Sequence, residues 1–417
     1  RAGFDAPGEW YYDVPAKKIL YRPRPGETLA GFEAVAPLAK LSTLISFKGD
    51  FANGRHVRNI GFRNIAIAHS AVPRPRLYHF QQGGILPDYG DGPTESWQYQ
   101  AAQYSDAAIM AEGVRNLSFA DCRIEHTGNY AFRFRSGCMS NEVVNCSIAD
   151  LGAGGVWMGA DINPFGEESD IPRRQVFPDR PDSTAFNLVS NCTITANSAE
   201  KGYMTRALGV YVEKGLVTHC NISSNKNGSG YGSMNWGGAV GMEGGRLTHC
   251  TIVGNEVKDQ GAGLYVSGAK PVIDNCLFAG NEAKTTNSGV PGSGGGAYFN
   301  AAATVSNCTF RANKSARGSA ITVNTGVAVD FYGCIFTGGQ SGGTSTGDAW
   351  PEIDVASSTF AHCISTKELS GSDCFVETTA ETLSADGITP NSTSKAVDRC
   401  PPDGYADLII STDLLGN

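Results

Sequence analysis

A short phrase built around cysteine recurs through most of the chain and constrains its fold more than any other feature. Asp, Asn, His or Gly precedes the cysteine, and Ile or Phe follows two positions after it. The phrase is centred on Cys122, Cys146, Cys192, Cys220, Cys250, Cys276, Cys308 and Cys334. The interval between successive cysteines is mostly one coil of roughly 25–30 residues, longer between Cys146 and Cys192, and Cys363 continues the series. Self-similarity at such a period indicates a repeat architecture.

A second, glycine-rich phrase with alternating apolar residues recurs between the cysteines. It begins at Gly154, Gly209, Gly237, Gly263 and Gly295. Each repeat therefore holds at least two short strands with apolar side chains at every second position. One such coil cannot bury its apolar face alone, whereas stacked coils with strands about 4.8 Å apart can. We predict an all-β, right-handed parallel β-helix of about ten to twelve coils, with long loop insertions in the early coils.

Three segments are expected along the chain. Residues 1–56 form a β-rich lead-in, 57–365 the β-helix, and 366–417 a closing segment. The chain begins with Arg1 rather than methionine, so we expect a fragment or a processed form whose targeting segment lies upstream.

Two ladders of identical residues are interpreted as structural. In-register cysteines on parallel strands have poor geometry for bridging, so stacked, buried, reduced thiols are expected. Cys374 and Cys400 lie outside the series, and one disulfide between them is a candidate. Asparagine follows five residues after the later cysteines, at Asn197, Asn225, Asn255, Asn281 and Asn313. Asparagine tolerates the left-handed region and bonds to backbone at turns, which suits a coil corner.

Composition excludes two classes of partner. The net charge is −8, and no Lys/Arg cluster is interleaved with aromatics, so nucleic acid is not expected. The sequence contains no run of about 18 apolar residues, so membrane insertion is not expected. No cofactor is expected, while structural calcium among loop carboxylates stays open.

The early coils depart from the regular pattern at one position. Aligned on the cysteine phrase, His69, His126 and Asp150 stand four residues after the cysteine position, with Glu125 beside His126. Later coils hold small residues there, namely Ala196, Ser224, Gly254, Gly280 and Ala312. Breaks in consistency are where function is expected. The alternative is that these are turn residues, with Asp150 capping a turn.

Three insertions flank these coils, at about 71–104, 160–184 and 227–236. The second carries Asp161, and the third carries Tyr231 and Trp236. Long loops on a regular scaffold commonly form binding sites. Aromatic rings stack on the apolar faces of sugars while carboxylates bond to hydroxyls, so we expect a polysaccharide or other glycan as partner.

Four stretches, 8–27, 57–70, 119–134 and 141–159, together resemble the β-helix glycoside hydrolases of the fucosidase/xylanase type, and the resemblance ends near Gly215. It implies an acidic pair in a groove near the early coils, with Asp150 on the DLGAGGV phrase and His126 on the HTG phrase. The chain departs from that family after Ile194, where an Asp-Gly-Gly-Arg-like phrase is usual. From about Cys220 it is similar to generic right-handed β-helix repeats of bacterial surfaces. Its end resembles the closing segment of such secreted proteins, which implies a secreted or cell-surface location.

Three mechanisms compete. In glycoside hydrolysis, carboxyl pairs lie about 5–5.5 Å apart in retaining enzymes and about 6.5–9.5 Å apart in inverting ones. Asp150 would pair with Glu125 or Asp161, and His126 would orient a carboxylate or bond a sugar hydroxyl. The substrate-binding candidates are His69, Trp157, Arg133, Tyr231 and Trp236. A lyase would use His126 as base, with cations from Arg133, Arg135, Arg173 and Arg174. The non-enzymatic alternative is an extracellular structural or adhesive protein, for which self-association stays open.

Overall fold

The computed structural model describes most of the chain. The described residues are 6–28 except 14 and 17, 41–70, 79–81, 84–86, 107–159, 184–199, 207–227, 237–286 except 269, 289–342, 353–377 except 356, 367 and 370, and 394. The chain divides into two compact units, residues 1–37 and 38–417. In the first, β1 (Trp10–Asp13) and β2 (Lys18–Tyr21) form an antiparallel pair.

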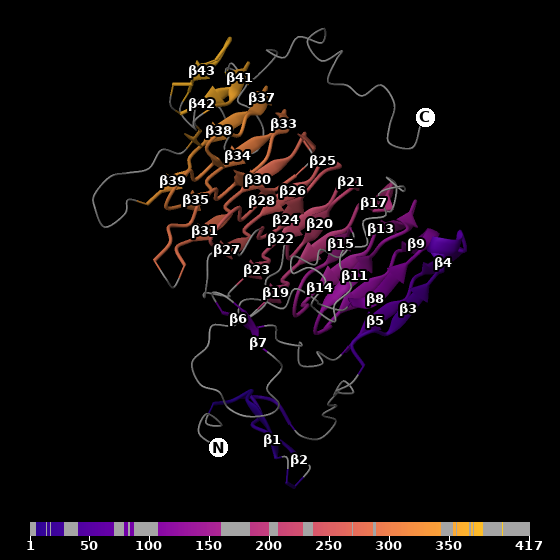
Figure 1. The fold of residues 1–417 in the computed structure, drawn as a ribbon. Helices are drawn as coiled ribbons and strands as arrows, with labels where there is room; N and C mark the ends of the chain where they lie inside the picture. Colours follow the sequence, from indigo (N-terminus) through magenta and orange to yellow (C-terminus); the bar gives the residue numbers. More distant parts are fainter. Residues whose placement is uncertain are drawn as a thin grey trace. The chain divides into compact units, whose positions relative to one another are not determined.

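Four parallel sheets build the second unit, and each is assembled from strands of successive coils (Figure 1). The first sheet contains β3 (Ile45–Lys48), β8 (Ala107–Glu112), β11 (Tyr130–Phe134), β15 (Val156–Met158), β20 (Val210–Val212), β24 (Val240–Met242), β28 (Leu264–Val266), β32 (Ala297–Phe299), β36 (Ile321–Val323) and β40 (Ile353–Asp354). The second sheet contains β4 (Val57–Arg63), β9 (Val114–Ala120), β12 (Cys138–Met139), β13 (Glu142–Val144), β16 (Thr184–Ala185), β17 (Asn187–Ser190), β21 (Gly215–Thr218), β25 (Arg246–Thr248), β29 (Val272–Asp274), β33 (Ala303–Ser306), β37 (Val329–Tyr332) and β41 (Thr359–Ala361).

The third sheet follows the second along each coil. It contains β5 (Ala66–Ala68), β10 (Arg123–Glu125), β14 (Ser147–Ala149), β18 (Thr193–Thr195), β22 (Asn221–Ser223), β26 (Thr251–Val253), β30 (Leu277–Ala279), β34 (Thr309–Arg311), β38 (Ile335–Thr337), β42 (Ile364–Ser365) and β43 (Phe375–Val376). The short fourth sheet contains β19 (Ser198–Ala199), β23 (Lys226–Asn227), β27 (Glu256–Lys258), β31 (Glu282–Lys284), β35 (Lys314–Ser315) and β39 (Gln340–Ser341). A 3-10 turn, η1 (Phe51–Asn53), and an antiparallel pair, β6 (His79–Gln81) and β7 (Gly84–Leu86), complete the described elements.

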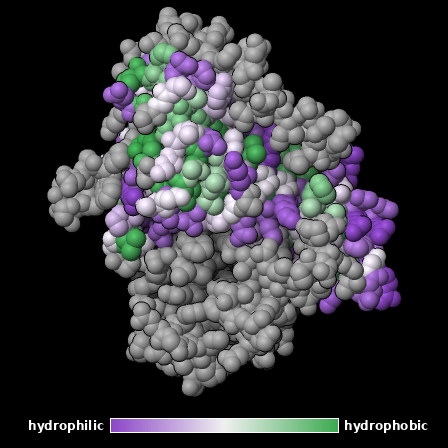
Figure 2. All heavy atoms as spheres, turned by 45° about the horizontal axis from the view of Figure 1, so that its top comes forward, coloured by the Kyte–Doolittle hydropathy of each residue, from purple (hydrophilic) through white to green (hydrophobic). Residues whose placement is uncertain are grey.

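This arrangement confirms the predicted right-handed parallel β-helix. The sheets extend past the expected limits of 57–365 at both ends, because β3 pairs in parallel with β8 and β43 pairs with β42. Figure 2 shows hydrophilic residues gathered where the first coils lie, at the right of that view. Over the later coils, hydrophobic and hydrophilic residues are mixed on the same face.

The core is a set of ladders of like residues. Ile124, Ile148, Ile194, Ile222 and Ile252 pair in register along the third sheet, and each is fully buried. Phenylalanine takes over the same position in later coils, where the rings of Phe278 and Phe310 stack 4.8 Å apart. Such stacking buries the apolar face that a single coil would leave in water.

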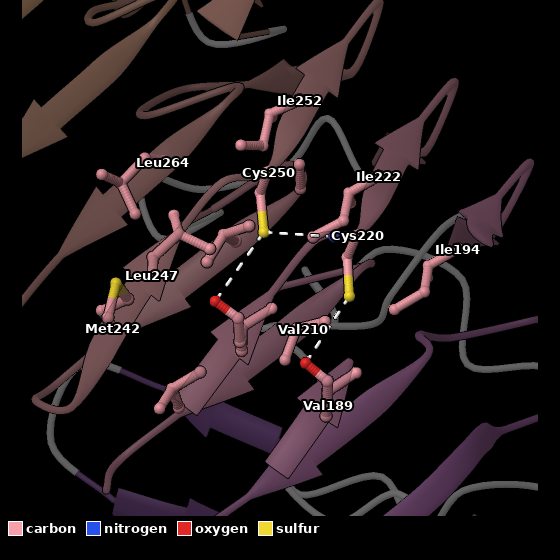
Figure 3. Packing of buried hydrophobic residues seen from close by; sticks show 14 of the residues in the cluster. Val189, Ile194, Val210, Cys220, Ile222, Met242, Leu247, Cys250, Ile252 and Leu264 are labelled. Atoms are coloured by element: carbon pink, nitrogen blue, oxygen red, sulfur yellow. Dashed lines mark hydrogen bonds between the residues drawn. The ribbon is translucent and has the colours of Figure 1, made fainter. Parts of the chain in front are cut away.

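The cysteine ladder lies beside this one. Every cysteine among the described residues is a free thiol, as expected for the series. Cys220 Sγ donates to Val189 O at 3.6 Å, and Cys250 Sγ donates to Val217 O at 3.8 Å (Figure 3). The disulfide expected at Cys374 is wrong: Cys374 is a free thiol, and Phe375 N–H bonds to Cys363 O, which continues the ladder by one coil. Cys400 lies outside the described residues.

The asparagine ladder is structural, as predicted, but its geometry differs from the expectation. The ladder asparagines are buried, and the residue before each of them adopts the left-handed conformation instead. At the centre, Asn255 Nδ2 donates to Ile222 O at 2.9 Å and to Asn281 Oδ1 at 3.0 Å. Its own Oδ1 accepts the backbone and side-chain N–H groups of Asn225. The ladder therefore satisfies the polar backbone of the corner from inside.

The left-handed corner position predicts a stabilising substitution. Ala196 and Ala312 occupy it with φ of 55° and 50°, where a Cβ costs about 1–2 kcal/mol. Ala196→Gly is therefore expected to raise the free energy of unfolding by about 1 kcal/mol, as measured by urea denaturation. Ala66→Gly, in an exposed strand position, is the control and should destabilise by about 0.5–1 kcal/mol. Destabilisation by Ala196→Gly would contradict the argument.

Candidate functional site

The predicted alignment of His69, His126 and Asp150 is seen in the structure. Each follows a strand of the third sheet, β5, β10 and β14, which pair in register. All three adopt the left-handed conformation, with φ of 64°, 51° and 55°. They therefore occupy the corner position that small residues hold in later coils, and their side chains form one row along the turn.

Contacts within this turn row are short. The rings of His69 and His126 are stacked, with centroids 5.2 Å apart and planes 7° apart. His126 Nδ1 lies 2.9 Å from Asp150 Oδ2. A carboxylate only accepts hydrogen bonds, so His126 Nδ1 is the donor in this contact. The Asp150 and His126 side chains are 71% and 46% exposed, so the pair contributes little stability and is open to a ligand.

The two predicted carboxyls of the early coils have different partners. Glu125 Oε1 lies 3.1 Å from Arg123 Nε on its own strand, whereas Asp150 is bonded to His126. No contact between these two carboxyls appears among the described residues. Asp161, Tyr231 and Trp236, together with Arg173 and Arg174, lie outside the described residues, so their predicted roles stay predictions.

Arg133 and Trp157 lie elsewhere, on the first sheet. Val156 and Met158 belong to the core, so Trp157 between them faces outward. Arg133 is its register partner on β11, and the guanidinium carbon lies 4.6 Å from the Trp157 ring centroid, a cation–π contact. Trp157 is 7% exposed, and its indole Nε1 is buried without a hydrogen-bond partner. This unsatisfied donor is an unusual feature for a folded interior.

An outward aromatic column continues from Trp157 along the first sheet. Tyr211 is its register partner, with ring centroids 4.7 Å apart. After Gly241 the column resumes with Tyr265 and Tyr298, which stack 5.6 Å apart with planes 4° apart. These rings are buried, at 2–8% exposure. The column is therefore a rigid platform, whereas the residues beside it are more accessible.

Those accessible residues form a polar row at the carboxyl ends of the strands. Each of them directly follows, or ends, a strand of the first sheet, and backbone pairing links each to a neighbouring coil. The polar row consists of Lys48, Glu112, Arg135, Glu213, Glu243, Ser267, Asn300 and Asn324. All are partly or fully exposed. Between Arg135 and Glu213 stands Gly159, where an added Cβ would lie 2.9 Å from Glu213 Oε2 and 3.3 Å from Tyr211 Cε1.

Sequence reasoning missed this polar row. Its signal was present, because Glu213 and Glu243 stand two residues after the outward position of the glycine-rich phrase. The structure thus brings the predicted residues together as two groups. His69, His126 and Asp150 share the turn row, and Arg133 and Trp157 share the first sheet. No contact between the two groups is seen among the described residues.

Comparison with known proteins identifies the class. A family model described as "Right handed beta helix region" matches residues 102–244 and 233–367. The chain therefore belongs to the right-handed β-helix family. No curated protein matches it. A solved structure named "Glycoside hydrolase" is similar, with 18% identity and a TM-score of 0.46, over 86% of this chain and 57% of that one. The chain thus spans just over half the length of that structure.

The described residues contain neither a membrane-spanning helix nor a metal-binding cluster. No helix there is long and apolar enough to cross a membrane. In the same residues, no group of three or more His, Cys, Asp or Glu side chains is placed to hold a metal ion.

Proposed function

We propose that this protein binds a polysaccharide along the polar row of the first sheet. The observation that carries the proposal is the row itself, in which each coil except that of Gly159 presents a carboxylate, amide, hydroxyl or basic side chain. Coils repeat at about 4.8 Å, close to the length of one sugar residue, so neighbouring sugars of an extended chain would meet equivalent positions. These side chains match the donors and acceptors of sugar hydroxyls.

We further propose that the bound glycan is hydrolysed. Glu213 and Glu243 follow β20 and β24, which are adjacent and in register, so their backbones are about one strand spacing, 4.8 Å, apart. That spacing suits the carboxyl separation of about 5–5.5 Å in retaining glycosidases. The Glu213 side chain packs over Gly159, which has no side chain of its own, and the buried Tyr211 ring lies beside it. Asp150, with Glu125 or Asp161, remains the alternative acidic pair from the sequence.

An extracellular location belongs to the same proposal, because extended polysaccharides are met at cell surfaces and outside cells. The reduced thiols are compatible with it, since ten of the eleven described cysteines are buried. Burial limits the access of oxidants that act on exposed thiolates.

Glu213→Gln and Glu243→Gln test this function. Each substitution removes a charged acceptor from the row, and we expect about tenfold weaker polysaccharide binding, equivalent to about 1.4 kcal/mol. Where a polysaccharide is hydrolysed, the release of reducing ends should fall by about 10²–10⁴-fold. Affinity electrophoresis against a panel of neutral and acidic polysaccharides gives the first measurement. Glu142→Gln, at an exposed site on the second sheet, is the matched control.

Two other outcomes would redirect the assignment. If Asp150→Asn abolishes hydrolysis while both glutamine variants retain it, the turn row is the catalytic site. If no polysaccharide binds, the structural or adhesive alternative becomes the better account.

A further inference from the structure

Two arginines stand directly opposite each other at the start of the second sheet. Arg58 on β4 and Arg115 on β9 are register partners on neighbouring parallel strands, so their backbones lie about 4.8 Å apart. Like charges in this arrangement are destabilising. The repulsion between the two arginines therefore needs compensation, and the surrounding carboxylates do not provide it.

The neighbouring arginines all have carboxylate partners. Arg55 pairs with Asp50, and Arg63 Nε lies 2.8 Å from Asp121. Arg123 lies 3.1 Å from Glu125, and Arg135 lies 3.1 Å from Glu112. For Arg58 and Arg115, by contrast, no salt bridge or side-chain hydrogen bond is seen within the described part of the chain. The chain as a whole is acidic, with net charge −8, so carboxylates are not scarce.

Arg115 also carries an unsatisfied donor. Its Nε atom is buried and has no hydrogen-bond partner, although the residue as a whole is only half-buried. A guanidinium N–H removed from water without an acceptor is costly. An oxyanion between the two guanidinium groups would satisfy that donor and cancel the repulsion together. Arginine suits this role because its planar fork bonds to carboxylate or sulfate through two parallel N–H groups.

The arginine pair lies one short turn from the polar row. Glu112 belongs to the row, and only Gly113 and Val114 separate it from Arg115. Gly113 adopts the left-handed conformation at this corner, with φ of 62°. A polymer along the row at the first coils would therefore pass close to the pair.

We infer that Arg58 and Arg115 form an oxyanion site that binds a carboxylate or sulfate group of an acidic polysaccharide. This rests on the proposed function, and it specifies that the glycan is anionic. The chemistry shared by uronates and sulfate esters is a planar or tetrahedral oxyanion, so the pair alone does not select between them. The two sources are distinguished by the probes below.

The first test uses sodium sulfate on the full chain. Thermal unfolding is followed in sulfate and in chloride at equal ionic strength, for the wild type, Arg58→Gln, Arg115→Gln and the control Arg123→Gln. Sulfate also stabilises proteins non-specifically, so only the difference between variants counts. A ligand bound to the native state raises Tm, and we expect the added rise in the wild type and in Arg123→Gln alone. An equal rise in all four proteins would overturn the site.

Loss of folding is not expected to confuse this test. Either glutamine variant removes the repulsion between the two cations, so Tm in chloride should be equal to or above that of the wild type. A large fall of Tm in chloride would instead mean that the pair has a structural role, and would overturn the inference.

The second test uses polymers, namely polygalacturonate, chondroitin sulfate and neutral dextran. We expect polygalacturonate or chondroitin sulfate to bind the wild type, and to bind either arginine variant at least tenfold more weakly. Which of the two polymers binds shows whether the site prefers carboxylate or sulfate. Neutral polymer bound equally by all variants would leave the proposed function standing and overturn the anionic assignment. Arginine-dependent stabilisation by sulfate without binding of any polymer would restrict the site to free oxyanions and defeat the proposed function.

Discussion

Raising the pH above about 9 is expected to unfold this protein steeply, because of its buried thiols. Burial raises the pKa of Cys138 from 9.0 to about 12. For Cys192 the hydrogen bond with Cys146 lowers the pKa, but the bond with Cys220 and burial outweigh it, and the pKa is again about 12. Burial likewise raises the pKa of Cys276 and Cys308. The folded state therefore holds thiol protons that the unfolded chain releases.

The direction of the effect follows from these raised values. Below the unfolded pKa both states keep the proton, and the stability contribution is fully present. As the pH rises from about 9 toward 12, the unfolded chain ionises first, and each thiol removes about 1.4 kcal/mol of stability per pH unit. Any three of these four thiols together remove about 4 kcal/mol of stability per pH unit, against a total free energy of unfolding of about 5–15 kcal/mol for a typical domain. We expect unfolding between about pH 10 and pH 12.

Urea denaturation at intervals of half a pH unit, in reducing buffer, measures this slope. Cys138→Ala is the matched variant, because it removes one buried thiol outside the stacked series. Its free energy of unfolding at neutral pH should fall, because packing around the thiol is lost. Above pH 9, its free energy of unfolding should decline less steeply with pH, by the amount that one titrating proton contributes. A slope unchanged by the substitution, or constant stability up to pH 11, would contradict the thiol explanation.

Interrupting the asparagine ladder is the second change with a large expected effect. Asn255→Ala leaves the backbone N–H of Asn225 and the carbonyl of Ile222 without their side-chain partner. Each orphaned buried group costs about 1–3 kcal/mol, so we expect a loss of about 3–5 kcal/mol. Asn255→Asp should be worse, because it replaces the donor with a buried charge.

The midpoint of urea denaturation and the number of transitions test this prediction. In a solenoid the coils on either side of the break contact only their neighbours, so a partly unfolded state is expected to appear. Asn221→Ala, at an exposed strand position one coil earlier, should change stability by less than about 0.5 kcal/mol. If Asn255→Ala stays within about 1 kcal/mol of the wild type, the ladder is not the corner's main support.

The two groups of candidate residues differ in how readily they can be predicted from the sequence. His69, His126 and Asp150 were found because one side chain per coil breaks a regular column, and alignment on the cysteine phrase reveals such a break directly. The aromatic column and the polar row use residue types that change from coil to coil. Arg135, Glu213 and Asn324 share no type, so only their equivalent place after a strand unites them.

From the sequence alone we could predict the repeat, the stacked coils, the thiol and asparagine ladders and the alignment of the turn row. These follow from periodicity, because a residue type that recurs once per coil must form a column when parallel strands stack in register. The three-dimensional fold was needed to show which columns face outward and which side chains meet. Arg58 and Arg115, which are distant in the chain, become neighbours through the pairing of β4 with β9. Such pairing cannot be predicted from a local sequence pattern, because an insertion of any length can separate two coils.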